Sequence, residues 1–171
     1  MAYVFVSIGS NIDRYQHISA SLDALQKHFS TLLISPVYES ESVGFDGDDF
    51  LNLVAGFHCD LSLSQLAIIL REIEQQNGRR RDGPKFSART LDIDILTFDD
   101  MTGVIDGVEL PRQEITENAF VLLPLSDIAP EQQHPLSKKT YASLWAAYDQ
   151  SSQKLWAVDF RWREQLISRA K

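Results

Sequence analysis

Two hydrophobic periodicities alternate between residues 2 and 98, and their order limits the folds that this chain can adopt. Alternating runs rich in β-branched and aromatic residues predict strands, whereas apolar residues three or four positions apart predict amphipathic helices. We expect strands at 2–9, 31–40, 50–60 and 90–98, and helices at 14–29 and 63–78. This β-α-β-β-α-β order predicts an α+β, ferredoxin-like fold, in which helices pack on an antiparallel sheet as in an α/β/α sandwich.

Turn and cap signals refine this prediction. Pro36, within the second expected strand, predicts a sheet edge or a bulge, because proline cannot donate to the ladder. Ser62 or Ser64 is expected to cap helix 63–78, and Gly78 to end it. After residue 98 we expect a hairpin partner around 104–110, a partly helical segment at 115–129, a short helix at 140–150 and one strand in the tail.

One domain over residues 1–171 is expected, with a C-terminal extension from about residue 151. Trp156, Phe160 and Trp162 in this tail are spaced for a strand with one aromatic face. Packing of that face on the domain predicts a monomer. Self-association through the same face is the alternative, and it predicts a dimer.

The composition, 44% hydrophobic and 23% charged over 171 residues, is typical of a globular domain with a substantial core. There is no run of about 18 apolar residues, so no membrane span is expected. The N-terminal stretch lacks the basic n-region of a signal peptide. Because Cys59 is the single cysteine, we expect neither an internal disulfide nor a cysteine-based zinc site. A cytoplasmic protein is the simplest interpretation.

Charge is unevenly distributed along the chain. The net charge of −8 argues against nucleic acid as a partner. The segment 79–89 is nevertheless basic, with Asp82 alone against Arg79, Arg80, Arg81, Lys85 and Arg89. This basic segment indicates an anionic ligand such as phosphate, and a solvated charged loop is the alternative. The stretch is not a P-loop, because Pro84 occupies the lysine position and because a helix precedes it.

Residues 89–96, RTLDIDIL, place two carboxylates on one face of the last expected strand. The apolar residues point to one side, and Thr90, Asp92 and Asp94 to the other. We expect strand 90–98 to be central in the sheet, where like charges on one face repel each other. Mg²⁺ resolves this conflict, since it binds a few carboxylates and leaves its other positions to water and phosphate oxygens. With arginines nearby the pair indicates phosphoryl transfer, and two solvated acids on a surface strand are the alternative.

Five stretches together resemble one family of enzymes. They are VSIGSN (6–11), DFLN (49–52), IEQQNGRRR (73–81), RTLDIDIL (89–96) and AFVLLPLSDIAP (119–130). In this order, over residues 2 to about 135, the chain resembles the 6-hydroxymethyl-7,8-dihydropterin pyrophosphokinases of folate biosynthesis. The resemblance implies transfer of the β,γ-diphosphate of ATP to the hydroxymethyl group of the pterin, with release of AMP.

The resemblance also implies the residues of the nucleotide half of the site. Asp92 and Asp94 would bind two Mg²⁺ ions. Arg79, Arg81 and Arg89 are the expected catalytic arginines, which would grip the phosphates as the basic segment closes over the site. The full set of expected ATP contacts is Glu74, Arg79, Arg81, Arg89, Ile95, Arg112 and Asn118.

For the pterin, the resemblance implies an aromatic sandwich. Phe50 and Phe120 would stack on the two faces of the ring, and Asn52 offers a donor and an acceptor to its amide edge. Phe50 stands where tyrosine is common in the family, and Phe86 where some members have tryptophan. Further contacts, largely from the backbone, are expected from Ser40, Ser42 and Val43.

The sequence departs from the family pattern in LPRQEITENAF, residues 110–120. Arg112 stands where the family has histidine, and Asn118 where it has arginine. Arg112 can bind phosphate, whereas Asn118 cannot replace a cation. Three outcomes follow: an active pyrophosphokinase in which Arg112 covers both roles, a weak or altered paralogue, or a pterin- and nucleotide-binding protein with little turnover. A Mg²⁺-dependent transferase with another acceptor is a further alternative.

Overall fold

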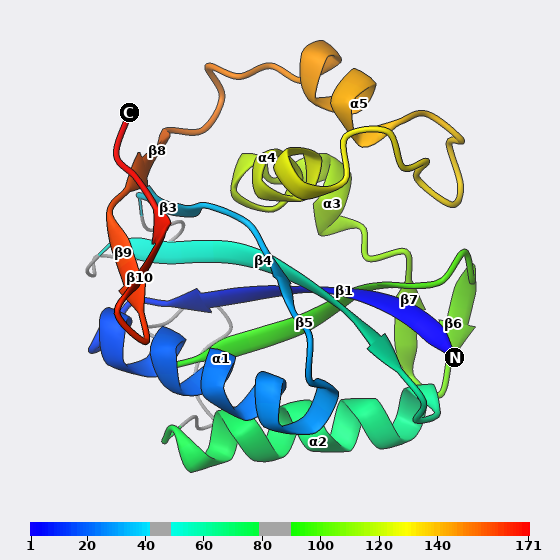
Figure 1. Ribbon diagram of the computed structural model, residues 1–171. Coiled ribbons are helices and arrows are strands. Elements are labelled where there is room, and N and C mark those ends of the chain that lie inside the picture. The colour runs from blue at the N-terminus through cyan, green and yellow to red at the C-terminus, as the bar shows by residue number, and fades with distance from the viewer. Residues whose placement is uncertain (42–48, 79–89) are drawn as a thin grey trace.

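A six-stranded antiparallel sheet forms the centre of the computed structural model, which describes residues 1–41, 49–78 and 90–171 (Figure 1). The strands are β1 (Ala2–Ser10), β2 (Leu33–Ile34), β3 (Val37–Ser40), β4 (Phe50–Cys59), β5 (Asp92–Phe98), β6 (Gly103–Ile105), β7 (Val108–Leu110), β8 (Leu155–Val158), β9 (Phe160–Trp162) and β10 (Gln165–Ser168). The helices are α1 (Arg14–Phe29), α2 (Leu63–Gln76), α3 (Glu114–Glu117), α4 (Ala119–Ile128) and α5 (Tyr141–Ala147).

The strand order confirms the expected ferredoxin-like arrangement and corrects one part of it. The sheet runs β5-β1-β4-β3-β8, with β2 pairing to β4, and β6–β7 and β9–β10 form two separate hairpins. β5 therefore lies at one edge, and the expectation that strand 90–98 is central is wrong. In a split βαβ fold the fourth strand pairs with the outer side of the first strand. The fourth strand, here β5, therefore has a neighbouring strand of the sheet on one side only.

α1 and α2 cover one face of the sheet, where the larger core lies (Figure 1). Their apolar residues recur at helical spacing, so that Ile18, Leu22 and Leu25 of α1 and Leu66 of α2 are fully buried. α3, α4 and α5 lie on the other face (Figure 1). The sheet is thus enclosed between two helical layers, as expected. None of the described helices is long and apolar enough to cross a membrane.

α2 begins at a capping box. The Ser62 hydroxyl accepts a hydrogen bond from Gln65 N at 3.3 Å, and Gln65 Oε1 accepts one from Ser62 N at 3.0 Å. Ser62 is therefore the cap, not Ser64. The helix ends at Gln76, and Gly78 follows with a φ of 81°, a left-handed conformation that suits glycine.

Pro36 divides the second expected strand into β2 and β3. Ile34 pairs with Ala55, whereas Tyr38 pairs with Asn52, so β3 carries one extra residue relative to β4. This is a bulge, one of the two outcomes that the proline predicts. In the gap, the Ser35 hydroxyl accepts from Val54 N at 2.9 Å and replaces part of the lost ladder.

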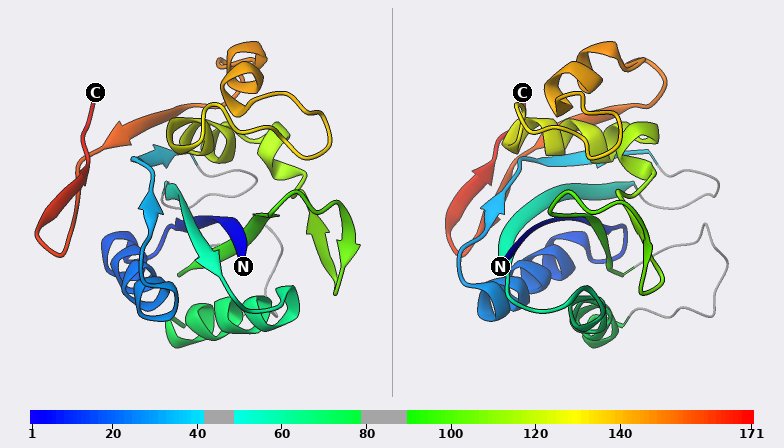
Figure 2. Two further views of the ribbon diagram at one scale, coloured as in Figure 1. Left: turned by 45° about the vertical axis from the view of Figure 1, so that its right-hand side comes forward. Right: turned by 90° about the vertical axis from the view of Figure 1, so that its right-hand side faces the viewer.

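The tail forms three short strands, where one was expected. β8 pairs with β3, and β9 and β10 form a hairpin on the opposite side of the molecule from β6–β7 (Figure 2). Arg163 and Glu164 both have positive φ, as is typical of one common two-residue hairpin turn, and this turn reverses the chain. Phe160 and Trp162 are buried in the larger core, whereas Trp156 is 41% exposed. The three aromatic residues therefore do not share one face.

Candidate active site

β5 presents Asp92 and Asp94 on the face that carries α3 and α4. Leu91, Ile93 and Ile95 on its other face are buried in the larger core, so the alternation read from the sequence is confirmed. Both carboxylates are partly buried. Burial, and next the charge of Asp92, raise the pKa of Asp94 to about 8. Two charged carboxylates are therefore unfavourable side by side here unless a cation binds between them.

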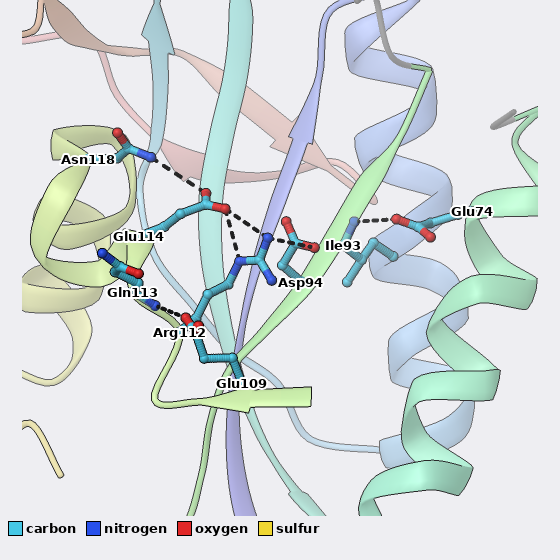
Figure 3. A network of polar contacts seen from close by, with 8 residues as sticks. All are labelled: Glu74, Ile93, Asp94, Glu109, Arg112, Gln113, Glu114 and Asn118. Carbon is cyan, nitrogen blue, oxygen red and sulfur yellow. Dashed lines mark hydrogen bonds and ion pairs between the residues drawn. The ribbon is translucent and has the colours of Figure 1, made fainter. Parts of the chain in front are cut away.

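Arg112 is the nearest cation to this pair among the described residues. Its Nη2 lies 3.6 Å from Asp94 Oδ1, and its Nε and Nη2 lie 3.1 and 2.7 Å from Glu114 Oε1. Asn118 Nδ2 lies 3.5 Å from the other oxygen of Glu114. Figure 3 shows this row of side chains leading from Asn118 through Glu114 and Arg112 to Asp94. Arg112 is thus shared between two carboxylates and faces the position where phosphate is expected.

Glu74 supports the same strand from α2. Its side chain is fully buried, and its Oε2 accepts a hydrogen bond from Ile93 N at 2.8 Å (Figure 3). Ile93 lies between the two aspartates, so this bond holds the outer edge of β5 at the point where the two carboxylates project from its face. Glu74 therefore has a structural contact of its own, in addition to the ATP contact that the resemblance implies.

A cavity of about 550 Å³ opens beside Asp94, a size typical of small-molecule sites. α2, β5, β7 and α3 contribute to its walls, and two of the expected ATP residues, Ile95 and Arg112, line it together with Asp94. Three further acids line the cavity, namely Glu109, Glu114 and Glu117, against one further cation, Arg71. A nucleotide in this cavity therefore needs additional positive charge around its phosphates.

The carboxylate pair fits Mg²⁺ by its chemistry and number. Within residues 1–41, 49–78 and 90–171, no group of three or more histidines, cysteines and acids could enclose a metal ion. Mg²⁺ is commonly bound by one or two carboxylates and completes its octahedron with water and substrate phosphates. Asp92 and Asp94 are therefore suited to a metal that arrives with a nucleotide.

The expected pterin residues gather at the start of β4. Asn52 is buried, and its Nδ2 donates to the Ser40 hydroxyl at 2.8 Å. Phe50, two residues earlier, is half-buried. Arg14 Nη1 donates a hydrogen bond to the backbone oxygen of the preceding residue, Asp49, at 2.9 Å. Phe120 lies in the first turn of α4, at the edge of the smaller core.

Gly9 of β1 joins the two halves of the site. It pairs with Asn52 of β4 on one side and with Asp92 of β5 on the other. A Cβ at this position would lie 3.3 Å from Asn52 Oδ1 and 3.8 Å from the Phe50 ring, so glycine leaves room above the strand. The expected pterin residue Asn52 and the expected metal ligand Asp92 are therefore two strand spacings apart, at about 4.8 Å per spacing.

The remaining expected site residues are Ser42, Val43, Arg79, Arg81, Phe86 and Arg89, and they lie outside the described residues. Sequence reasoning missed Glu114 as the partner of Arg112 and gave Gly9 no role of its own. A glycine inside an alternating strand was the available signal for Gly9. Nothing in the local sequence pattern marks Glu114.

Comparison with known proteins identifies the family of this chain. Residues 5–130 match the family model described as 7,8-dihydro-6-hydroxymethylpterin-pyrophosphokinase (HPPK). A 2-amino-4-hydroxy-6-hydroxymethyldihydropteridine pyrophosphokinase of Pseudomonas aeruginosa is 37% identical over 136 residues, which cover 77% of this chain and 83% of the relative. One from Porphyromonas gingivalis is 38% identical over 136 residues, covering 76% of this chain and 92% of the relative.

Solved structures show the same fold. A Plasmodium falciparum HPPK-DHPS crystal structure aligns with a TM-score of 0.75 at 14% identity, over 98% of this chain and 46% of that one. The chain thus spans less than half the length of that solved protein. The family match over residues 5–130 and the two bacterial relatives show that this chain belongs to the 7,8-dihydro-6-hydroxymethylpterin-pyrophosphokinase family.

Proposed function

We propose that this chain transfers the β,γ-diphosphate of ATP to the hydroxymethyl group of 6-hydroxymethyl-7,8-dihydropterin, giving the pterin diphosphate and AMP in folate biosynthesis. The observation that carries the proposal is the register Asn52–Gly9–Asp92 across β4, β1 and β5. It brings a side chain suited to a pterin amide edge close to a carboxylate suited to Mg²⁺. Family membership supports the same reaction.

In this reaction, Asp92 and Asp94 hold the metal, for which we propose two Mg²⁺ ions. Bound Mg²⁺ neutralises charge that develops on the transferring phosphates. Arg112 reaches the same phosphates from β7's end of the cavity, since it already lies 3.6 Å from Asp94. We also assign Arg79, Arg81 and Arg89 to the phosphates. The matched sequence motifs support that assignment.

The acceptor is positioned by aromatic faces and one amide. Phe50 and Phe120 hold the two faces of the pterin ring, and Asn52 binds its amide edge. Asn52 Nδ2 already donates to Ser40, so its Oδ1, directed towards Gly9, is the atom we assign to the pterin. This orientation directs the hydroxymethyl oxygen towards β5 for in-line attack on the β-phosphorus.

The chain acts as a monomer in this proposal, because Phe160 and Trp162 are used inside its own core. Neither nucleic acid nor a membrane is needed as a partner. A cytoplasmic location suits an enzyme that consumes ATP and carries a free, buried cysteine, Cys59.

One assay separates the candidate functions. The chain is incubated with ATP, Mg²⁺ and hydroxymethyldihydropterin, and AMP and pterin diphosphate are followed together. We expect AMP to form only when the pterin is present, and Asp92→Ala or Asp94→Ala to abolish it while the fold is retained. AMP formed with a different acceptor identifies another Mg²⁺-dependent transferase. Binding of both ligands without AMP identifies a binding protein and contradicts the proposal.

A further inference from the structure

The segment between α5 and β8 is bonded to the junction of α3 and α4, next to the proposed site. Gln153 Oε1 accepts from Ala119 N at 2.8 Å, and Gln153 Nε2 donates to Asn118 Oδ1 at 3.1 Å. Tyr148, in the same segment, donates its hydroxyl to Glu117 O at 2.7 Å. All three bonds come from residues beyond 130, where the match to the family model ends.

Gln153 supplies the cap that α4 lacks. Asn118 is the N-terminal cap residue of α4, but its side chain makes no capping hydrogen bond. The first N–H groups of a helix have no partner within it, and Ala119 is fully buried. The Gln153 carboxamide satisfies Ala119 N and so fixes the first turn of α4, which carries Phe120.

The other end of the same carboxamide sets the orientation of Asn118. Because Asn118 Oδ1 accepts from Gln153, its Nδ2 is directed towards Glu114 Oε2, 3.5 Å away. Glu114 Oε1 in turn binds Arg112, beside Asp94. The hydrogen bonds of Gln153 therefore lead to both halves of the site. One path ends at Phe120 and the other at Arg112.

We propose that Gln153 is a positioning residue for catalysis, which places Phe120 through Ala119 and places Arg112 through Asn118 and Glu114. The inference rests on the proposed pyrophosphokinase activity. It assigns to Asn118 a role that does not require the positive charge of the family's arginine. Asn118 transmits the position of the tail to the phosphate-binding side chain.

Two substitutions separate the two paths. Gln153→Ala removes both bonds, so we expect KM for the pterin and KM for ATP each to rise about tenfold, because small displacements of binding groups have effects of this order. Gln153→Glu can still accept from Ala119 N but cannot donate to Asn118, so we expect only KM for ATP to rise. Gln150→Ala is the control, since Gln150 is exposed in the same segment and its side chain donates to Trp145 O, at 3.3 Å.

The kinetic constants are measured well below the unfolding midpoint of each variant. If both Gln153 variants stay within twofold of wild type, or if Gln153→Glu raises the two KM values alike, the inference is wrong. A wild-type chain that forms no AMP contradicts the proposed function instead. In that case, Kd for Mg²⁺–ATP is compared by calorimetry. The inference is supported if both Gln153 variants bind Mg²⁺–ATP more weakly than wild type and Gln150→Ala does not. It is overturned if the Kd values of all these proteins are equal.

Discussion

Asp94, which we propose as a metal ligand, carries a cost to stability. The pKa of its carboxyl is raised to about 8, chiefly by burial, from about 4 in an unfolded chain. A folded carboxyl with a raised pKa binds its proton more tightly than the unfolded chain does. Its protonation therefore stabilises the metal-free fold below about pH 4, and this contribution is lost as the pH rises towards 8.

The substitution Asp94→Asn tests this cost. The unfolding midpoint of the metal-free variant should exceed that of wild type by a margin that grows between pH 4 and pH 8 and is then constant. At pH 8 we expect a margin of at least about 2–4 °C, the shift that 1 kcal/mol gives a chain of this size. The measurement is thermal unfolding with EDTA, and Asp60→Asn, at an exposed position, is the control. A margin that does not change with pH would contradict the assignment.

Gly9 is tested by adding one methyl group. In Gly9→Ala the new Cβ lies 3.3 Å from Asn52 Oδ1, so the amide must move away from the pterin position. We expect KM for the pterin to rise about tenfold, which corresponds to about 1.4 kcal/mol, with a small change in the unfolding midpoint. Gly56→Ala is the control, because its Cβ would clash at 2.8 Å with Phe5 and Tyr3. That variant should lose stability and keep its KM, and the reverse pattern would refute the role of Gly9.

Asn118 stands where the family pattern has arginine, and its side chain is hydrogen-bonded to Gln153 and Glu114. In Asn118→Arg, an added cation comes close to the phosphates, but the side chain can no longer accept from Gln153. We therefore expect no gain in kcat/KM for ATP from this change alone. Combined with Gln153→Glu, whose carboxylate can accept from both the introduced guanidinium and Ala119 N, the gain over the single variant should be about tenfold. Equal kinetics for the single and double variants would exclude coupling between these positions.

At the scale of elements, α2 and β5 act together through one buried carboxylate. Glu74→Ala removes the acceptor for Ile93 N and leaves a buried donor unpaired, which should cost about 1–3 kcal/mol of stability and raise KM for ATP. Glu74→Gln keeps an acceptor and should restore stability. Glu72→Ala, exposed on the same helix, is the control. If Glu74→Gln is as unstable as Glu74→Ala, the bond to β5 is not what stabilises this element.

The elements that the sequence predicted well are those with a long, regular pattern. β1, α1, β4, α2 and β5 lie where periodicity placed them, and Asp92 and Asp94 share a face as alternation requires. The prediction that β5 is central was wrong because, in this order of elements, the fourth strand pairs only with the first and so forms an edge of the sheet. The tail was read as one strand because the aromatic spacing dominated, and the turn at Arg163 and Glu164 uses no glycine.

The contacts between distant residues that support the proposed site could not be predicted from local sequence patterns. Glu74 meets Ile93 across 19 positions of sequence, and Gln153 meets Asn118 across 35. Neither glutamate on a helix nor glutamine in a polar tail is a signal by itself. Motifs therefore predicted the side chains that touch substrate, and the fold was needed to find the side chains that contact these.

At the scale of the whole molecule, the C-terminal tail serves two separate purposes. Gln153 reaches the site, whereas β9–β10 completes the larger core beside α1, where Trp162 Nε1 donates to Asp23 at 2.9 Å. The second purpose concerns stability, because Phe160 and Trp162 pack into the larger core, whereas Asp92 and Asp94 project from the other face of the sheet. Trp162, which is buried, and Trp156, which is exposed, allow the contribution of the tail to stability to be tested.

Trp162→Ala should lower the unfolding midpoint by about 6–20 °C, because truncation of a buried aromatic costs about 3–5 kcal/mol and each kcal/mol is about 2–4 °C here. Trp156→Ala, at a 41% exposed position, should change it by less than about 2 °C. Both variants should keep the wild-type KM values when assayed at low temperature. Sedimentation of the Trp156 variant then checks the monomer: a mass that falls from dimer to monomer would show that this exposed ring mediates self-association, contrary to our proposal.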